Sequence, residues 1–203
     1  MRRLCSTHLP PKSSICTTVR RHVLYISLTF VFTVYQTDKY DELANNLRSQ
    51  NIECHFVKGS TISESDLPQI ACSDGRQCLV VIDDGSMEVA QSKELAHCFT
   101  VARHHSCSIL VLLHFLYTPN FQPMRVISAN TTYFVLLKSS RLLSQVATLG
   151  SQLQIRKELL AAYRDQCAKD YGYLLVDLHT TTPDKLRLRT DLLNEHQTVY
   201  VPI

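Results

Sequence analysis

Short apolar runs recur along the chain, and segments with helical spacing separate most of them. Several runs are apolar at almost every position instead of alternating with polar residues. Such strands are buried on both faces, and strands separated by helices are typical of a parallel sheet. The sequence therefore predicts an α/β fold with a mainly parallel sheet and helices on both faces. The predicted strands span residues 23–35, 52–57, 79–82, 108–115, 132–137, 173–178 and 198–201, and the predicted helices 38–49, 87–102, 141–149 and 154–168.

The composition is that of a globular protein. Of the 203 residues, 45% are hydrophobic and 19% charged, and the formal net charge of +3 by itself implies no polyanionic partner. The longest apolar run, residues 23–35, is shorter than the ~20 residues that a membrane helix needs, so we expect no membrane segment. The eight cysteines form no C-x-x-C pair, which indicates an intracellular protein, nuclear or cytoplasmic, without a disulfide framework.

The chain divides into a leader and one domain. Residues 1–20 show no clear periodicity and contain Pro10-Pro11, so we expect a poorly determined leader. Residues 21–203 hold no internal repeat and no low-complexity tract, which favours one α/β domain.

The stretch CLVVIDDGSM ends an apolar strand on two acids, Asp83 and Asp84. In open parallel sheets, ligands bind outside the carboxyl ends of the strands. There one carboxylate can hold Mg²⁺ beside a phosphate and the next can orient an attacking water, which is the Walker B arrangement of P-loop NTPases. The alternative is structural, because Asp-Asp-Gly-Ser also suits a turn in which Asp84 caps the next helix.

A longer pattern around these acids resembles a known family. It is similar to the DNA-packaging ATPases of Polinton-like and adintovirus-type elements, which are relatives of the poxvirus packaging ATPases in the FtsK–HerA group of P-loop motors. The resemblance covers roughly residues 33–203. It is carried by the double-Asp strand end, Cys98-Phe99-Thr100 at a helix end, the pair His104-His105 before an apolar strand, and the blocks VYQTDKYDELANNL, HFVKGS, RVISANTTYFVLLKSSR, YGYLLVDLHTTTPDKLRLRT and VYVPI.

The resemblance implies a function and roles for particular residues. Members of this family hydrolyse ATP with Mg²⁺ and drive double-stranded DNA into a capsid as a homo-oligomeric ring. By resemblance, Asp83 holds Mg²⁺ directly or through water, Asp84 activates water, and Arg141 acts on a neighbouring subunit's nucleotide. For Arg141 the alternative is an exposed arginine in the first turn of a helix. Arg125 and Asn130 match family positions as well.

Two departures from the family pattern change the expected activity. A phosphate-binding loop needs G-x-x-x-x-G-K-[ST], and the sequence contains no Gly-Lys pair. Where the family places a polar sensor after a strand, this chain has His114-Phe115-Leu116, and phenylalanine cannot bind a phosphate or water by a hydrogen bond. We therefore expect a remnant or fragment of such an ATPase, incomplete at its N-terminus, whose hydrolysis is weak or absent. The alternative is a non-enzymatic α/β module, derived from a mobile element, that binds DNA or a protein.

Three further groups of residues have both a functional and a structural interpretation. Lys185, Arg187 and Arg189 alternate with leucines and would share one face of an extended segment, where they bind DNA phosphates or simply protect a sheet edge. Asp177 at a strand end is expected to accept a hydrogen bond rather than perform chemistry. The third group suggests zinc, although its spacing fits no standard finger and Cys98 is expected on a buried helix face: His97, Cys98, His104, His105 and Cys107.

Overall fold

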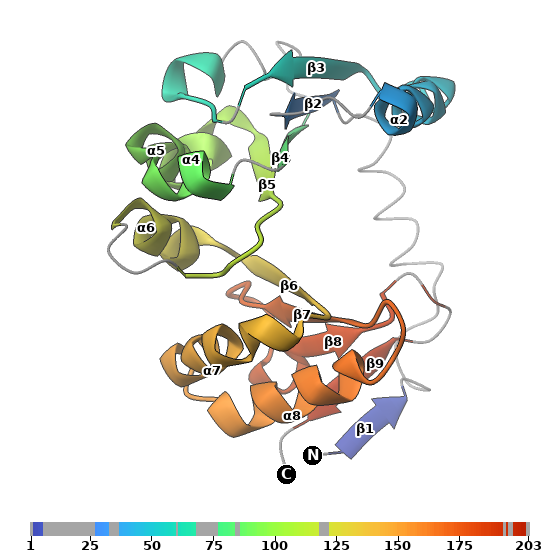
Figure 1. Cartoon of the computed structure of the whole chain (residues 1–203), viewed down its shortest axis with the longest axis vertical. Helices are drawn as coiled ribbons and strands as arrows, with labels where there is room; N and C mark the ends of the chain where they lie inside the picture. Colours follow the sequence, from blue (N-terminus) through green and yellow to red (C-terminus); the bar gives the residue numbers. More distant parts are fainter. Residues whose placement is uncertain are drawn as a thin grey trace. The chain divides into compact units, whose positions relative to one another are not determined.

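The computed structural model describes residues 2–5, 27–32, 37–59, 61–67, 77–83, 86–117, 122–192, 194 and 197–201. The chain forms two compact units (Figure 1). We call residues 10–130 the parallel unit, and residues 1–9 together with 131–203 the antiparallel unit, after the sheet that each contains. Within the described residues, no helix combines the length and the apolar character needed to cross a bilayer.

The parallel unit contains a four-stranded sheet in the order β3-β2-β4-β5 (Figure 1). All three strand pairs are parallel, which confirms the predicted α/β class and parallel sheet for this half of the chain. Parallel neighbours need a crossover connection, and α2 supplies the one between β2 and β3. The strands are β2 (Ser27–Phe32), β3 (Cys54–Lys58), β4 (Cys78–Asp83) and β5 (Cys107–Val111), and the helices are α2 (Thr37–Ser49), α4 (Ser86–Gln91), α5 (Lys93–Val101) and α6 (Gln122–Asn130).

Helices cover both faces of this sheet, as the apolar strands predict. Phe30 lies opposite Val81 in the register, and both pack on the face toward Leu43 and Leu47 of α2. Alternate residues of the same strands point to the other face, because successive side chains in a strand point in opposite directions. There they form the larger core cluster with α4, α5 and α6, which contains Val31, Val80, Ile82, Val89, Leu95, Met124 and Ile127.

The antiparallel unit contains a five-stranded sheet in the order β1-β9-β8-β7-β6, in which every pair is antiparallel. Its helices α7 and α8 pack on one another, and α8 also contacts β7. Buried residues of these helices include Leu149 and Leu159. The strands are β1 (Arg2–Cys5), β6 (Tyr133–Leu137), β7 (Tyr173–Asp177), β8 (Leu188–Thr190) and β9 (Thr198–Val201), and the helices are α7 (Leu143–Gln152) and α8 (Arg156–Cys167).

The expectation of one mainly parallel sheet is therefore wrong for residues 131–203. The connection from β7 to β8 holds only a 3₁₀ turn, η4 (Asp184–Leu186), so it is too short for the crossover that a parallel neighbour requires. The apolar run of β6 is also not buried on both faces: the exposed fractions of Tyr133, Val135 and Leu137 are 53%, 51% and 65%. Residues 2–5 of the predicted leader form an edge strand, because their backbone pairs with β9.

Candidate functional site

The strand order of the parallel unit creates one point where a ligand crevice is expected. From β2 the chain crosses to β3 on one side, and β4 then lies on the other side of β2. In sheets of this kind the chain's reversal leaves a crevice outside the carboxyl ends of the two central strands. Asp83 is the last residue of β4, and it lies opposite Phe32, the last residue of β2. The structure thus places Asp83 at the strand end where the sequence predicts it.

The carboxylate of Asp83 is held from the neighbouring helix. The hydroxyl of Tyr40, in the first turn of α2, donates a hydrogen bond of 2.6 Å to Oδ2 of Asp83. Asp83 itself is partly buried, whereas Tyr40 is only 7% exposed. A carboxylate can accept several bonds through its two oxygens, so the bond to Tyr40 leaves Asp83 chemically able to contact a cation as well.

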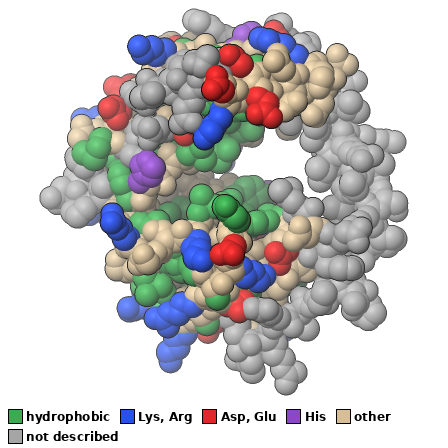
Figure 2. Space-filling view, turned by 45° about the vertical axis from the view of Figure 1, so that its right-hand side comes forward, with side chains coloured by type: hydrophobic (Ala, Val, Ile, Leu, Met, Phe, Trp, Pro, Cys, Tyr) green, Lys and Arg blue, Asp and Glu red, His purple; other side chains and the backbone are tan. Residues whose placement is uncertain are grey.

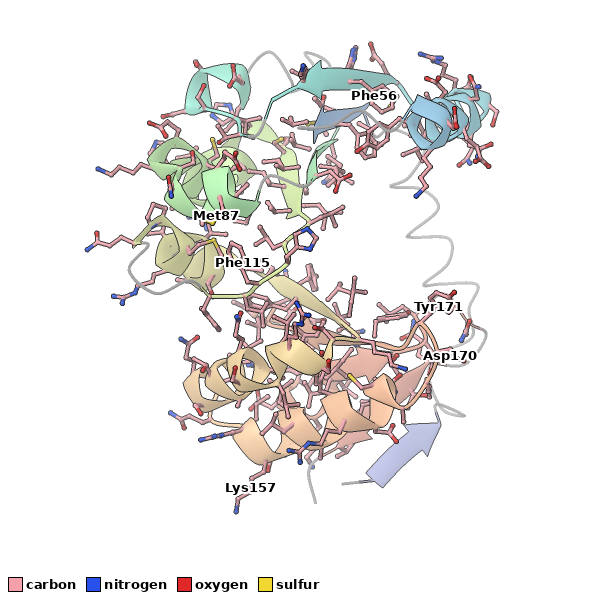
Figure 3. All side chains as sticks on the ribbon, in the orientation of Figure 1. Phe56, Met87, Phe115, Lys157, Asp170 and Tyr171 are labelled. Carbon is pink, nitrogen blue, oxygen red and sulfur yellow. The ribbon has the colours of Figure 1, made fainter. Side chains whose placement is uncertain are left out.

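An aromatic cluster fixes Tyr40 in this position. Its ring centroid lies 6.1 Å from that of Phe30 on β2 and 5.7 Å from that of Phe56 on β3. Phe30 and Phe56 stack on each other with centroids 5.3 Å apart and an interplanar angle of 12° (Figure 3 labels Phe56). The buried ring of Phe30 and the partly buried ring of Phe56 restrict the phenol, so its hydroxyl stays directed at the end of β4. Sequence reasoning missed Tyr40, although an aromatic residue in the first turn of the helix that follows a strand is a usable signal.

The second acid of the predicted pair, Asp84, lies outside the described residues, as does Gly85. Its role in activating water therefore stays a prediction. The helix α4 begins immediately afterwards at Ser86, as both the Walker B interpretation and the turn interpretation require.

The segment His114-Phe115-Leu116, where the sequence lacks the expected polar sensor, follows β5 and is only partly packed. After β5 ends at Val111, the amide of Leu112 still donates to the carbonyl of Ile82. Phe115 is partly buried against the core cluster of the parallel unit, while His114 is exposed (Figure 3 labels Phe115). Phe115 thus contributes apolar packing.

The residues that resemble family arginines lie in two different units. Arg141 is exposed in the 3₁₀ turn η3 (Ser140–Leu142), which precedes α7 in the antiparallel unit. Arg125 is exposed on α6 of the parallel unit. At the end of the same helix, the side-chain amide of Asn130 donates a 2.9 Å hydrogen bond to the backbone carbonyl of Val126. These positions agree with ordinary helix-surface residues, and a role of Arg141 in a neighbouring subunit stays a prediction.

The three cations at residues 185–189 do not share one extended face. Lys185 lies in the 3₁₀ turn η4 and Arg187 ends that turn, so the extended segment assumed from the sequence is wrong there. Arg187 pairs with Asp184 at 2.8 Å, and Arg189 forms an ion pair with the buried Asp177. The guanidinium of Arg189 is therefore already paired with a carboxylate inside the antiparallel unit. On each unit, the face drawn in Figure 2 carries both basic (Lys or Arg) and acidic (Asp or Glu) side chains.

Asp177 at the end of β7 is buried and accepts hydrogen bonds, as its position at a strand end predicts. Its side chain is 3% exposed. It accepts from the His179 amide at 2.9 Å and from the Thr182 hydroxyl at 3.1 Å, besides its ion pair with Arg189. A carboxylate with this many donors stabilises the loop after β7.

The histidines and cysteines suggested for zinc are spread over several elements. In the part of the chain that the structure describes, no three His, Cys, Asp or Glu side chains gather as metal ligands. His97 instead contacts Glu64, with 2.8 Å between Nε2 and Oε2. The pair His104-His105 lies in the 3₁₀ turn η2 (Ala102–His105) between α5 and β5. Cys98 lies on the buried face of α5, as predicted.

In comparisons with known proteins, no family model, curated protein or solved structure matches the chain.

Proposed function

We propose that the chain is a remnant or fragment of a viral-type DNA-packaging ATPase, with a P-loop NTPase-like parallel unit whose hydrolysis is weak or absent. The observation that carries this proposal is the position of Asp83 at the carboxyl end of β4, beside β2, where a parallel sheet of this order binds ligands. The pattern resemblance described above supports the same ancestry.

The residues present fit Mg²⁺ better than they fit ATP. Mg²⁺ in phosphate sites is usually held by one or two carboxylates together with waters and phosphate oxygens, so Asp83 with Asp84 forms a sufficient protein contribution. A complete ATP site also needs the glycine amides and lysine of a phosphate-binding loop, which this sequence lacks. Tyr40 would orient the Asp83 carboxylate through its hydrogen bond. The expected state is thus a retained cation site without an efficient catalytic site.

The wider scheme carries over from the family resemblance. It comprises double-stranded DNA as partner, a homo-oligomeric ring, and Arg141 acting on the nucleotide of a neighbouring subunit. The ion pairs of Arg187 and Arg189 make those two residues weaker candidates for binding DNA phosphates than Lys185.

The cation site is tested by ligand-induced stabilisation. A ligand that binds only the folded state raises the unfolding temperature, and the added stability grows with the logarithm of the ligand concentration divided by Kd. We expect Mg²⁺, and Mg²⁺ with ATP, to raise the unfolding temperature of the wild-type chain but not that of Asp83→Asn. The matched control is Asp170→Asn, since Asp170 is a carboxylate with a 98% exposed side chain in the other unit (Figure 3). An equal response of all three proteins would refute the site.

Hydrolysis is tested on the purified chain beside Asp84→Asn. We expect Mg²⁺-dependent ATP turnover to be at or near background in both proteins, because the phosphate-binding loop is missing. Robust turnover by the wild type that disappears in Asp84→Asn would instead show a working ATPase.

A further inference from the structure

Two cysteine thiols of the parallel unit lie side by side at the amino ends of neighbouring strands. Cys78 is the first residue of β4 and Cys107 is the first residue of β5. The register pairs the two residues directly, and their Sγ atoms are 3.2 Å apart. Both side chains belong to the larger core cluster, with exposed fractions of 1% and 6%.

The backbone geometry suits a covalent bond between them. Neighbouring strands lie ~4.8 Å apart, which falls within the ~4.4–6.8 Å between Cα atoms that a disulfide spans. Residues paired in a parallel register direct their side chains to the same face of the sheet. Closing the 3.2 Å gap to a bond of ~2.05 Å therefore needs mainly small side-chain rotations.

We propose that Cys78 and Cys107 form a reversible dithiol–disulfide site that a peroxide oxidises. This site lies at the opposite end of β4 from Asp83 and is independent of the function proposed above.

The reaction balances with a peroxide, ROOH, as the oxidant. The thiolate of one cysteine attacks the peroxide oxygen, the O–O bond breaks, and a sulfenic acid and the alcohol ROH form. The thiol of the other cysteine then attacks the sulfenic sulfur, which forms the S–S bond and releases water. In total the two thiols lose two protons and two electrons, which reduce the peroxide to ROH and water. A small-molecule dithiol reverses the reaction by thiol–disulfide exchange.

The environment assigns the first step to Cys78. A hydrogen bond from the Cys107 thiol stabilises the Cys78 thiolate and lowers the pKa of Cys78, although burial acts against this. The same pairing, together with burial, raises the pKa of Cys107. The thiolate is the nucleophile, so Cys78 attacks the oxidant and Cys107 resolves the sulfenic acid.

Access to the buried pair comes from the end of an edge strand. Among the described strands of the parallel unit, β5 is at the edge of the sheet, and Cys107 is its first residue. The preceding residue, Ser106, is exposed and has a positive φ of 52°. Strand ends of this kind open locally at a lower free energy than the whole unit, which gives small peroxides transient access.

A nearby cysteine supplies an internal control. Cys98 on α5 belongs to the same buried cluster, and burial raises its pKa to about 11. Its thiol is therefore a poor nucleophile at neutral pH. If burial alone controlled oxidation, Cys98 would be oxidised to the same extent as Cys78 and Cys107. The proposed reaction instead oxidises Cys78 and Cys107 and leaves Cys98 as a thiol.

The test is peptide mapping of the oxidised full chain without reduction. Trypsin places the three cysteines in separate peptides, since residues 77–93, 94–103 and 104–125 are each bounded by Lys or Arg cleavage sites. After mild hydrogen peroxide treatment and alkylation, we expect peptides 77–93 and 104–125 to be linked, with a mass lower by two hydrogens than their sum. Reduction with dithiothreitol should restore the separate peptides.

Two variants make the outcome decisive. Cys98→Ala should leave the linked peptide unchanged. Cys107→Ser, whose hydroxyl can still donate a hydrogen bond to the Cys78 thiolate, should abolish the link and leave Cys78 as a sulfenic acid that a dimedone-type probe captures. The proposal is overturned if the wild-type chain yields unlinked peptides, irreversible oxygen adducts, or links to other cysteines in place of the 78–107 pair. Because the wild-type map decides the question, a folding defect in either variant does not obscure it.

Discussion

The hydroxyl of Tyr40 donates a 2.6 Å hydrogen bond to the carboxylate of Asp83, across 43 positions of sequence. This bond joins the first turn of α2 to the end of β4, so the helix that connects β2 and β3 also orients the acid of the neighbouring strand. The edge of the sheet where a ligand is expected is therefore organised before any ligand arrives.

Replacing Tyr40 by phenylalanine should destabilise the parallel unit. The aromatic packing on Phe30 and Phe56 remains, while the hydrogen bond from the Tyr40 hydroxyl to the partly buried Asp83 carboxylate is lost. We expect the free energy of unfolding to fall by about 1–2 kcal/mol, as measured by urea denaturation. Tyr133→Phe is the matched control, because Tyr133 is 53% exposed and its replacement should change stability by less than about 0.5 kcal/mol. Equal effects of both substitutions would contradict a stabilising role of the Tyr40 hydroxyl.

The ion pair of Asp177 and Arg189 should be far more sensitive than the one between Asp184 and Arg187. Asp177 has a 3% exposed side chain, whereas the Asp184 side chain is 89% exposed. Asp177→Asn leaves the largely buried Arg189 without its counter-charge, so we expect a loss of about 3 kcal/mol in the free energy of unfolding. Asp184→Asn should cost at most about 1 kcal/mol, because water screens an exposed pair. Chemical denaturation of both variants measures the two losses of stability. Similar losses for Asp177→Asn and Asp184→Asn would contradict the prediction.

Truncation of two neighbouring leucines in β6 should have very different effects on stability. Leu136 is 4% exposed and Leu137 is 65% exposed, because adjacent strand residues point to opposite faces. Leu136→Ala should lower the free energy of unfolding by about 2–5 kcal/mol through lost burial and a cavity. Leu137→Ala should change it by less than about 0.5 kcal/mol. A large cost at Leu137 would mean that its exposed face is covered in solution.

Tyr163 should make stability depend on alkaline pH. Its hydroxyl lies 2.9 Å from the Ser139 carbonyl and accepts from the Ser139 amide at 3.0 Å. Burial, and then the neighbouring Cys167 thiol, raise the pKa of Tyr163 to about 12, against the opposing hydrogen bond from Ser139. A raised pKa means that the folded state holds the proton more tightly than the unfolded state, whose phenol titrates near pH ~10. The stabilisation is thus complete below pH ~10 and is lost as the pH rises through 12.

The measurement for Tyr163 compares the wild type with Tyr163→Phe at several pH values. Below pH ~10 the wild type should be more stable by about 1–2 kcal/mol, because the variant lacks the hydroxyl that bonds Ser139. This difference should shrink as the pH rises further. Because lysines and cysteines titrate in both proteins, only the difference reports on Tyr163. A difference that stays constant or grows with pH would contradict the assignment.

The parallel half of the fold could be predicted because its sequence signals are local. Strands such as 79–82 are apolar throughout and helices separate them, so burial on both faces and parallel pairing follow from the pattern. The antiparallel half could not be predicted in the same way. The sequence of β6, YFVLL, is as apolar as a central strand, and only its position at the sheet edge leaves every second side chain exposed.

The candidate site was predictable only where one segment carries it. Asp83 follows from the strand that precedes it, whereas its bond with Tyr40 depends on how α2 crosses the sheet. For the cations at 185–189, the sequence pattern predicted the wrong conformation. Their alternation suggested an extended face, but Pro183 and the turn after it form a 3₁₀ helix, and the buried Asp177 binds Arg189. Charge spacing alone cannot reveal which cation is already paired.

The pairing of β1 with β9 determines the order in which the two units can fold during synthesis. β1 precedes the parallel unit in the chain, so its backbone must wait for residues 198–201 to become paired with β9, while the parallel unit is synthesised in between. The parallel unit can therefore fold while the five-stranded antiparallel sheet still lacks β9. A product that terminates before residue 198 would leave β1 and one edge of β8 unpaired, and such open edges invite aggregation.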